Sequence, residues 1–169
     1  MKKVLIVAGA VSALALTAAP AGAATPTQQA TATARIVVPL TLEWVRDLDL
    51  GTVVLSGTAP YTDTIKIDET GAFTGCVNVT CSGTPQTAQY KATGTADQPL
   101  TITVSSTIAL ANQTNTTAPD LTMTTYKPAS VALDSTGEVT FDLGGSIQVS
   151  DTTADGVYLG TFDVSADYQ

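Results

Sequence analysis

Hydrophobic and polar residues alternate in short runs along most of this chain, most clearly in residues 100–104, 139–143 and 156–169. A period of two places successive side chains on opposite faces, so each run predicts a strand with one buried and one solvated face. Turn sequences separate the runs at intervals of roughly ten residues, and Val and Thr, which favour strands, are frequent. The pattern predicts an all-β fold: a single β-sandwich of immunoglobulin-like or Greek-key form over residues 35–169.

The final run, residues 156–169, is long and regular. Its apolar parity holds Tyr158, Gly160, Phe162, Val164, Ala166 and Tyr168. From Thr161 onward, the residues between these positions are polar. The run predicts a single strand, which is either a closing strand of the sandwich or an edge on which another protein docks.

Three further features refine the predicted strands. Residues 35–46 form the first expected strand, with a break at Pro39 because proline has no N–H to donate. Gly144 and Gly145 fall inside a strand pattern and predict a bulge or a sharp bend. Trp44 is the only tryptophan, and we expect it in the core.

The N-terminus has the pattern of a bacterial signal peptide. Lys2 and Lys3 precede an apolar run over residues 4–16, and Ala21-Gly22-Ala23 is a small-residue cleavage site. We expect residues 1–23 to be removed and the mature chain to be exported to the periplasm, the cell surface or the medium. No later stretch is long and apolar enough to predict an integral membrane segment.

Residues 24–34 are low in complexity, and Thr alternates with Ala from residue 30 onward. One interpretation is a disordered leader before the first strand. The other is a donor strand that inserts into a neighbouring subunit, with Ala30, Ala32, Ala34 and Ile36 on its inserted face.

The chain is acidic, with a formal net charge of −8 and a pI of about 4.1. This charge excludes nucleic acid as an expected partner, because nothing offsets the repulsion from phosphates. The charge indicates either solubility alone or an acidic binding surface.

The two cysteines, Cys76 and Cys81, are separated by four residues. In an exported chain this spacing predicts a local disulfide that fixes a loop. A metal site would need more ligands, and the chain contains no histidine.

The sequence contains no recognisable catalytic motif. Without histidine there is no Ser-His-Asp or Cys-His arrangement, and no phosphate loop or dinucleotide fingerprint is present. Asp151, Asp155 and Gly156 could offer oxygen ligands to calcium, but their spacing is that of a solvated turn. We therefore expect no enzyme activity and no cofactor.

The C-terminal run resembles the signature of chaperone–usher pilus subunits. Gly156 is the fourteenth residue from the end, apolar residues alternate after it, and Tyr168 is the penultimate residue. The resemblance implies that this strand is recognised by a periplasmic chaperone and by like subunits, through strand addition to an incomplete sandwich.

The wider chain is similar to an exported bacterial family, domain of unknown function 4402, which is itself remotely similar to pilin and spore-coat-U-like subunits. The similarity rests on residues 34–42 with Leu50 and Gly51, residues 88–90 with Gly94, residues 133–137 with Phe141, Gly144 and Gly145, residues 156–162, and the Tyr168-Gln169 end.

These observations predict an exported, non-catalytic structural protein, a subunit of a surface appendage or coat that assembles by β-strand complementation. The alternative is a self-contained periplasmic or secreted sandwich that binds a ligand or a polysaccharide through its loops.

Overall fold

The computed structural model describes residues 27–169, so the predicted signal peptide and residues 24–26 lie outside the described part. The chain divides into two units, Met1–Arg35 and Ile36–Gln169. Residues 27–35 contain neither helix nor strand, and their side chains are exposed.

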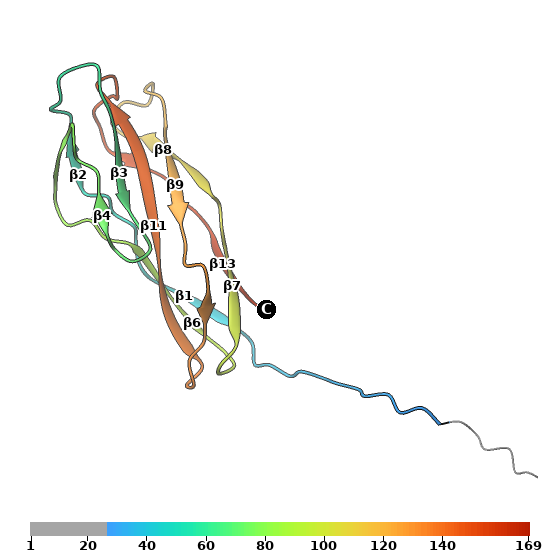
Figure 1. Cartoon of the computed structure of the whole chain (residues 1–169). Helices are drawn as coiled ribbons and strands as arrows, with labels where there is room; N and C mark the ends of the chain where they lie inside the picture. The colour runs from blue at the N-terminus through green and yellow to red at the C-terminus, as the bar shows by residue number, and fades with distance from the viewer. Residues whose placement is uncertain (1–26) are drawn as a thin grey trace, which may run out of the picture. The chain divides into compact units, whose positions relative to one another are not determined.

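The unit Ile36–Gln169 is built entirely from strands, and residues 27–169 contain no helix (Figure 1). Its strands are β1 (Thr41–Arg46), β2 (Thr52–Val54), β3 (Thr62–Ile67), β4 (Phe73–Thr74), β5 (Thr80–Ser82), β6 (Ala88–Thr93), β7 (Pro99–Val104), β8 (Thr107–Asn112), β9 (Leu121–Tyr126), β10 (Val131–Ala132), β11 (Glu138–Ser150), β12 (Tyr158–Leu159) and β13 (Val164–Tyr168). All strand pairs are antiparallel. The predicted all-β sandwich is confirmed.

Three sheets make up this unit. The largest has the strand order β1-β6-β11-β9-β8-β12, with β3 pairing β11 and β4 in addition. A second sheet has the order β10-β7-β13, and β2 pairs with β5 in the third. β1 and β13 each lie at the edge of their sheet.

Strand β11 organises the largest sheet. Its residues up to Leu143 pair with β6, whereas the strand from Gly145 onward pairs with β3, and residues 144–147 also pair with β9. The bulge that was one of the two expectations for Gly144 and Gly145 is absent, because no register shift interrupts β11. The strand continues through both glycines, and they mark the point where its neighbours change.

Two clusters of buried side chains form the core. The first core cluster lies between the β10-β7-β13 sheet and strands β6 and β11, and contains Ala88, Ala92, Leu100, Ile102, Val131, Leu133, Phe141 and Leu143. The second core cluster lies around the other half of β11 and contains Ile65, Val79, Ile108, Leu110, Met123, Ile147 and Val149. Leu48 and Phe162 pack against both clusters.

The first strand differs from its prediction. It begins at Thr41, beyond Pro39, and a register shift occurs between Trp44 and Arg46. Trp44 is 58% exposed, so its expected place in the core is wrong. The indole N–H donates to Asp47 Oδ1 at 3.0 Å, next to the register shift in this strand.

Candidate functional site

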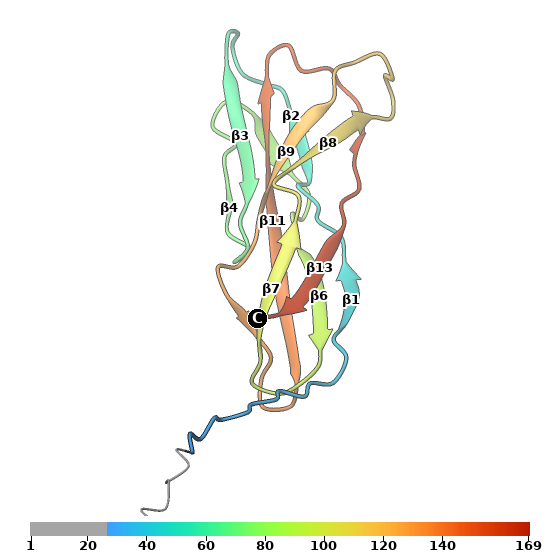
Figure 2. The same ribbon diagram turned by 90° about the vertical axis from the view of Figure 1, so that its right-hand side faces the viewer.

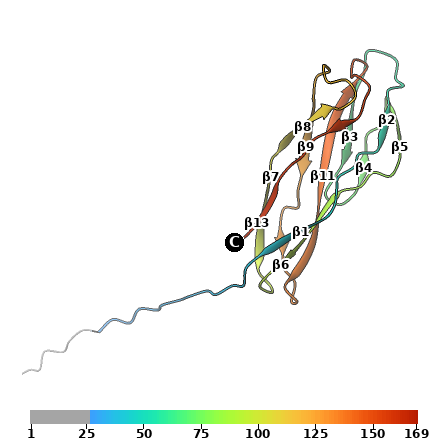
Figure 3. The same cartoon turned by 180° about the vertical axis from the view of Figure 1, so that it is seen from behind.

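The C-terminal run does not form one continuous strand. Residues Tyr158–Leu159 (β12) pair with β8 in the largest sheet, and Val164–Tyr168 (β13) pairs with β7 in the second sheet. Residues 160–163 cross between them. The predicted single strand is therefore wrong, and the reason lies in the two strands with which the segment pairs, β8 and β7. β7 and β8 follow one another closely in the chain but belong to different sheets, so a segment that pairs with both must change sheets as well (Figure 3).

The predicted alternation is nevertheless confirmed. Of its apolar parity, Tyr158, Phe162, Val164, Ala166 and Tyr168 are all half-buried, and from Thr161 onward the residues of the other parity are exposed. Gly160, on the apolar parity, is exposed. The four residues from Phe162 to Tyr168 on this parity pack against the first core cluster. The C-terminal segment thus contributes an apolar row to the core that is only partly covered.

Strand β13 has one free side. Its registered partners are all on β7, from Val104 opposite Val164 to Leu100 opposite Tyr168. Within residues 27–169, no strand pairs with its other side (Figure 2). We call this side the open edge of β13. Leu40, which precedes β1, and Leu42, which lies in β1, pack against the same core cluster. β1 is also an edge strand and pairs only with β6.

The far end of β13 is fixed by the hydroxyl of Tyr168. The hydroxyl accepts from Thr95 N and donates to Val38 O, each at 2.8 Å. The next residue, Gln169, donates its backbone N–H to Pro99 O at 3.1 Å. The penultimate tyrosine, which we expected in a docking strand, therefore ties the C-terminus to the segment before β1 and to the β6–β7 loop.

Gly156 has a clear structural role. Its φ of +143° lies in the region that favours glycine, and a Cβ there would collide with the side-chain amide of Asn112. That amide is buried. Its Nδ2 donates to Asp155 O, and its Oδ1 accepts from the backbone N–H groups of Thr114 and Asn115. Gly156 lets the chain pass close to this hydrogen-bonded amide as it enters β12.

The donor-strand residues form no strand. Ala30, Ala32 and Ala34 belong to the first unit and are exposed. Ile36 begins the second unit and is 92% exposed. The donor-strand interpretation stays a prediction.

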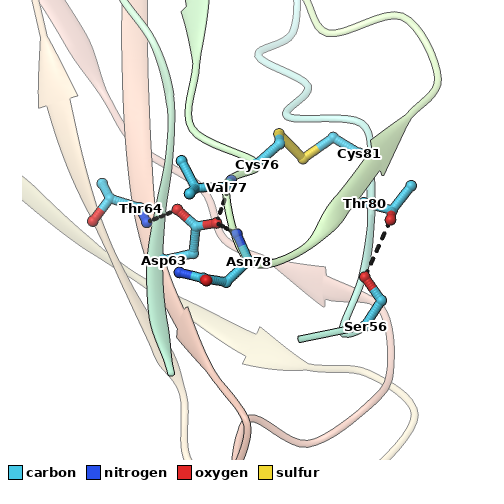
Figure 4. The surroundings of a disulfide bond; sticks show 8 residues. All are labelled: Ser56, Asp63, Thr64, Cys76, Val77, Asn78, Thr80 and Cys81. Carbon is cyan, nitrogen blue, oxygen red and sulfur yellow. Dashed lines mark hydrogen bonds between the residues drawn. A yellow bond between two sulfur atoms is a disulfide. The ribbon is translucent and has the colours of Figure 1, made fainter. Parts of the chain in front are cut away.

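Cys76 and Cys81 are joined by a disulfide, with their Cα atoms 5.9 Å apart (Figure 4). Beside it lies a residue that sequence reasoning missed, the buried carboxylate of Asp63. Its Oδ2 accepts from Val77 N and Asn78 N at 2.7 Å each, and its Oδ1 accepts from Thr64 N at 2.9 Å. The only signal in the sequence was an aspartate on the apolar parity of residues 62–67.

These hydrogen bonds stabilise the charged form of the carboxyl group. The N–H of Asn78 has the largest effect, and those of Val77 and Thr64 add to it. Together they hold the pKa of Asp63 below its ordinary value of 3.8, although burial acts in the opposite direction.

Acidic side chains lie around the half-buried row. Burial raises the pKa of Tyr90, whose ring stacks on Phe141 with the ring centroids 5.9 Å apart, and the charges of Asp47 and Asp163 raise it further. Asp163 and Asp167 are exposed and lie on the parity opposite the apolar row. The outer face of the β13 segment is therefore acidic and its inner face is apolar.

Within residues 27–169, no group of three or more His, Cys, Asp or Glu side chains is arranged to hold a metal ion. The same residues include no helix of the length and apolarity needed to cross a membrane.

Comparison with known proteins identifies a family. Residues 40–168, from just before β1 to the end of β13, match the family described as Domain of unknown function (DUF4402). The chain matches no curated protein and no solved structure. Since the match covers more than half of the sequence, the chain belongs to the DUF4402 family.

Proposed function

We propose that this protein is an exported, non-catalytic structural subunit of a surface appendage or coat, and that it assembles by β-strand addition. The observation that carries the proposal is the open edge of β13, which borders an apolar row that is only half-buried. A chaperone would occupy this edge before assembly and a like subunit would occupy it afterwards.

The physical basis is the set of groups that an edge strand leaves without partners. An unpaired strand presents N–H and C=O groups in a row, and an added strand satisfies them with a ladder of hydrogen bonds. Its alternate side chains would cover Val164 and Ala166, which now pack against the core from one side. The ladder supplies affinity and the side-chain alternation fixes the register.

The proposed donor is the N-terminal segment of a second copy. Ala30, Ala32, Ala34 and Ile36 share one parity, and an exposed Ile36 gains most from burial. Covering the exposed isoleucine side chain fully would contribute about 1.5–3 kcal/mol. The alanines contribute less, because each buries less apolar surface.

The test compares two aspartate substitutions in the mature protein isolated after export. Ala34→Asp places a charge on the inserted face, whereas the matched control Thr33→Asp places it on the opposite face of the same segment. Sedimentation velocity should show loss of polymer for Ala34→Asp and retention for Thr33→Asp. Deletion of residues 24–34 should leave a folded monomer.

The outcome that contradicts the proposal is a wild-type mature protein that is a stable monomer and is unaffected by removal of either terminus. That result would support the self-contained, ligand-binding sandwich instead.

A further inference from the structure

The loop that carries the disulfide is held by contacts that do not involve sulfur. Residues 75–79 lie beside β3, and the backbone N–H groups of Val77 and Asn78, directly after Cys76, both donate to the Asp63 carboxylate. Val79 is buried in the second core cluster. Cys76 is therefore held by the hydrogen bonds and the burial of the residues that follow it, in addition to its disulfide (Figure 4).

The second cysteine is positioned by a different set of contacts. Cys81 lies in the centre of β5 and is opposite Val53 of β2 in the ladder. The neighbouring Thr80 hydroxyl lies 3.1 Å from that of Ser56, within hydrogen-bonding distance. The Asp63 carboxylate thus positions the segment after Cys76, and the pairing of β5 with β2 positions Cys81.

We infer that Asp63 is a positioning residue for disulfide formation: its carboxylate orders residues 76–79 so that the two thiols lie within bridging range before they are oxidised. In that reaction a small-molecule disulfide accepts two electrons from Cys76 and Cys81. The Sγ–Sγ bond forms, the two thiol protons are released to solvent, and the oxidant leaves as two thiolates that take up two protons. The inference is independent of how the protein assembles.

The carboxylate is needed rather than an amide of the same shape. An amide offers one acceptor oxygen, so Asp63→Asn must turn its NH₂ group either toward the N–H groups of Val77 and Asn78 or toward Thr64 N. A donor then faces a donor inside a buried site. Hydrogen bonds to a charged group are the stronger ones, so we expect their loss to lower the effective concentration of the two thiols by about tenfold or more.

The experiment measures the thiol–disulfide equilibrium of the folded mature protein in glutathione buffers, with alkylation and mass spectrometry to count free thiols. The matched control is Asp68→Asn. Asp68 also accepts hydrogen bonds from a turn, at Thr70 N and Ala72 N, but that turn does not contain a cysteine. We expect Asp63→Asn to shift the equilibrium toward the dithiol and Asp68→Asn to leave it unchanged. An unchanged equilibrium in Asp63→Asn, or an equal shift in both variants, overturns the inference.

A second measurement covers the case in which Asp63→Asn does not fold. In the double variant Cys76→Ser/Cys81→Ser, amide hydrogen exchange should still protect Val77 and Asn78, because the carboxylate alone orders the loop. Loss of that protection in an otherwise folded protein would show that the disulfide orders the loop, and would overturn the inference.

Discussion

The hydroxyl of Tyr168 packs closely against the Cα of Gly94, with no room for a side chain on that glycine. A Cβ on Gly94 would lie closer than 3.0 Å to Tyr168 Oη, a distance that real Cβ atoms essentially never show. We predict that Gly94→Ala and Tyr168→Phe are strongly coupled, because the second change removes the atom with which the first collides.

The magnitudes follow from the local contacts. Tyr168→Phe removes two hydrogen bonds, to Thr95 N and Val38 O, whose partners are not fully buried, so the expected cost is about 1–2 kcal/mol. Gly94→Ala in the wild-type background overpacks the site and should cost about 1–3 kcal/mol. In the Tyr168→Phe background, the nearest remaining atoms are the methyl tips of Leu40 and Leu133 at 3.1 Å, which can move. There the alanine should cost at least about 1 kcal/mol less than it does in the wild-type background.

The assay is equilibrium unfolding in urea for the wild type, both single variants and the double variant, under conditions in which each is monomeric. Far-UV circular dichroism is the appropriate probe, since Trp44 is already 58% exposed in the folded state and its fluorescence would report poorly. Equal costs of Gly94→Ala in the two backgrounds would refute the steric argument.

Three further predictions concern stability. Hydrogen bonds from Thr136 and then from Glu138 lower the pKa of the Asp134 carboxyl group, so its charged form stabilises the fold above the ordinary pKa of 3.8 and this contribution is lost as the pH falls through the folded value. In acid titrations, Asp134→Asn should therefore lose unfolding free energy less steeply than the wild type, and an equal slope contradicts this. Removing the disulfide with a Cys76→Ser/Cys81→Ser double variant should cost about 2 kcal/mol in urea unfolding, because the closed loop is short; a cost near zero contradicts the loop-entropy estimate. Ile65→Ala should lower the unfolding free energy by about 2–5 kcal/mol, since Ile65 is 0% exposed in the second core cluster, and a loss under about 1 kcal/mol would mean that the site collapses around the smaller side chain.

Local periodicity predicted the features that depend only on the pleat of a strand. The parity of residues 158–168 is an example, because alternate residues of any extended segment point to opposite faces. The disulfide followed from the short spacing of the two cysteines and from the predicted export of the chain. Neither prediction needed to know which distant strands pair with these residues.

The features that were missed depend on distant partners. The C-terminal run divides into β12 and β13 because β7 and β8 lie in different sheets, which the run itself does not encode. The partners of Tyr168 are 130 and 73 residues away in the sequence. Trp44 is exposed, although Leu42 in the same strand packs against the first core cluster, and the sequence of β1 does not encode this difference. The candidate site is the edge of a sheet, so its face could be predicted from sequence but its lack of a neighbour could not.

Two sets of contacts within the chain hold β13 in place, and both matter for the proposed assembly. β7 and the Tyr168 hydroxyl hold the strand on one side and at one end, so the strand is ordered before any partner arrives. A docking strand that became ordered only on binding would lose about 1–2 kcal/mol of backbone entropy for each residue. Preorganisation removes that cost and leaves the hydrogen-bonding groups of the open edge in register for an incoming strand. If the assembly proposal is right, Tyr168→Phe should weaken subunit association as well as folding, even though the hydroxyl itself points toward Val38 and Thr95 of its own chain.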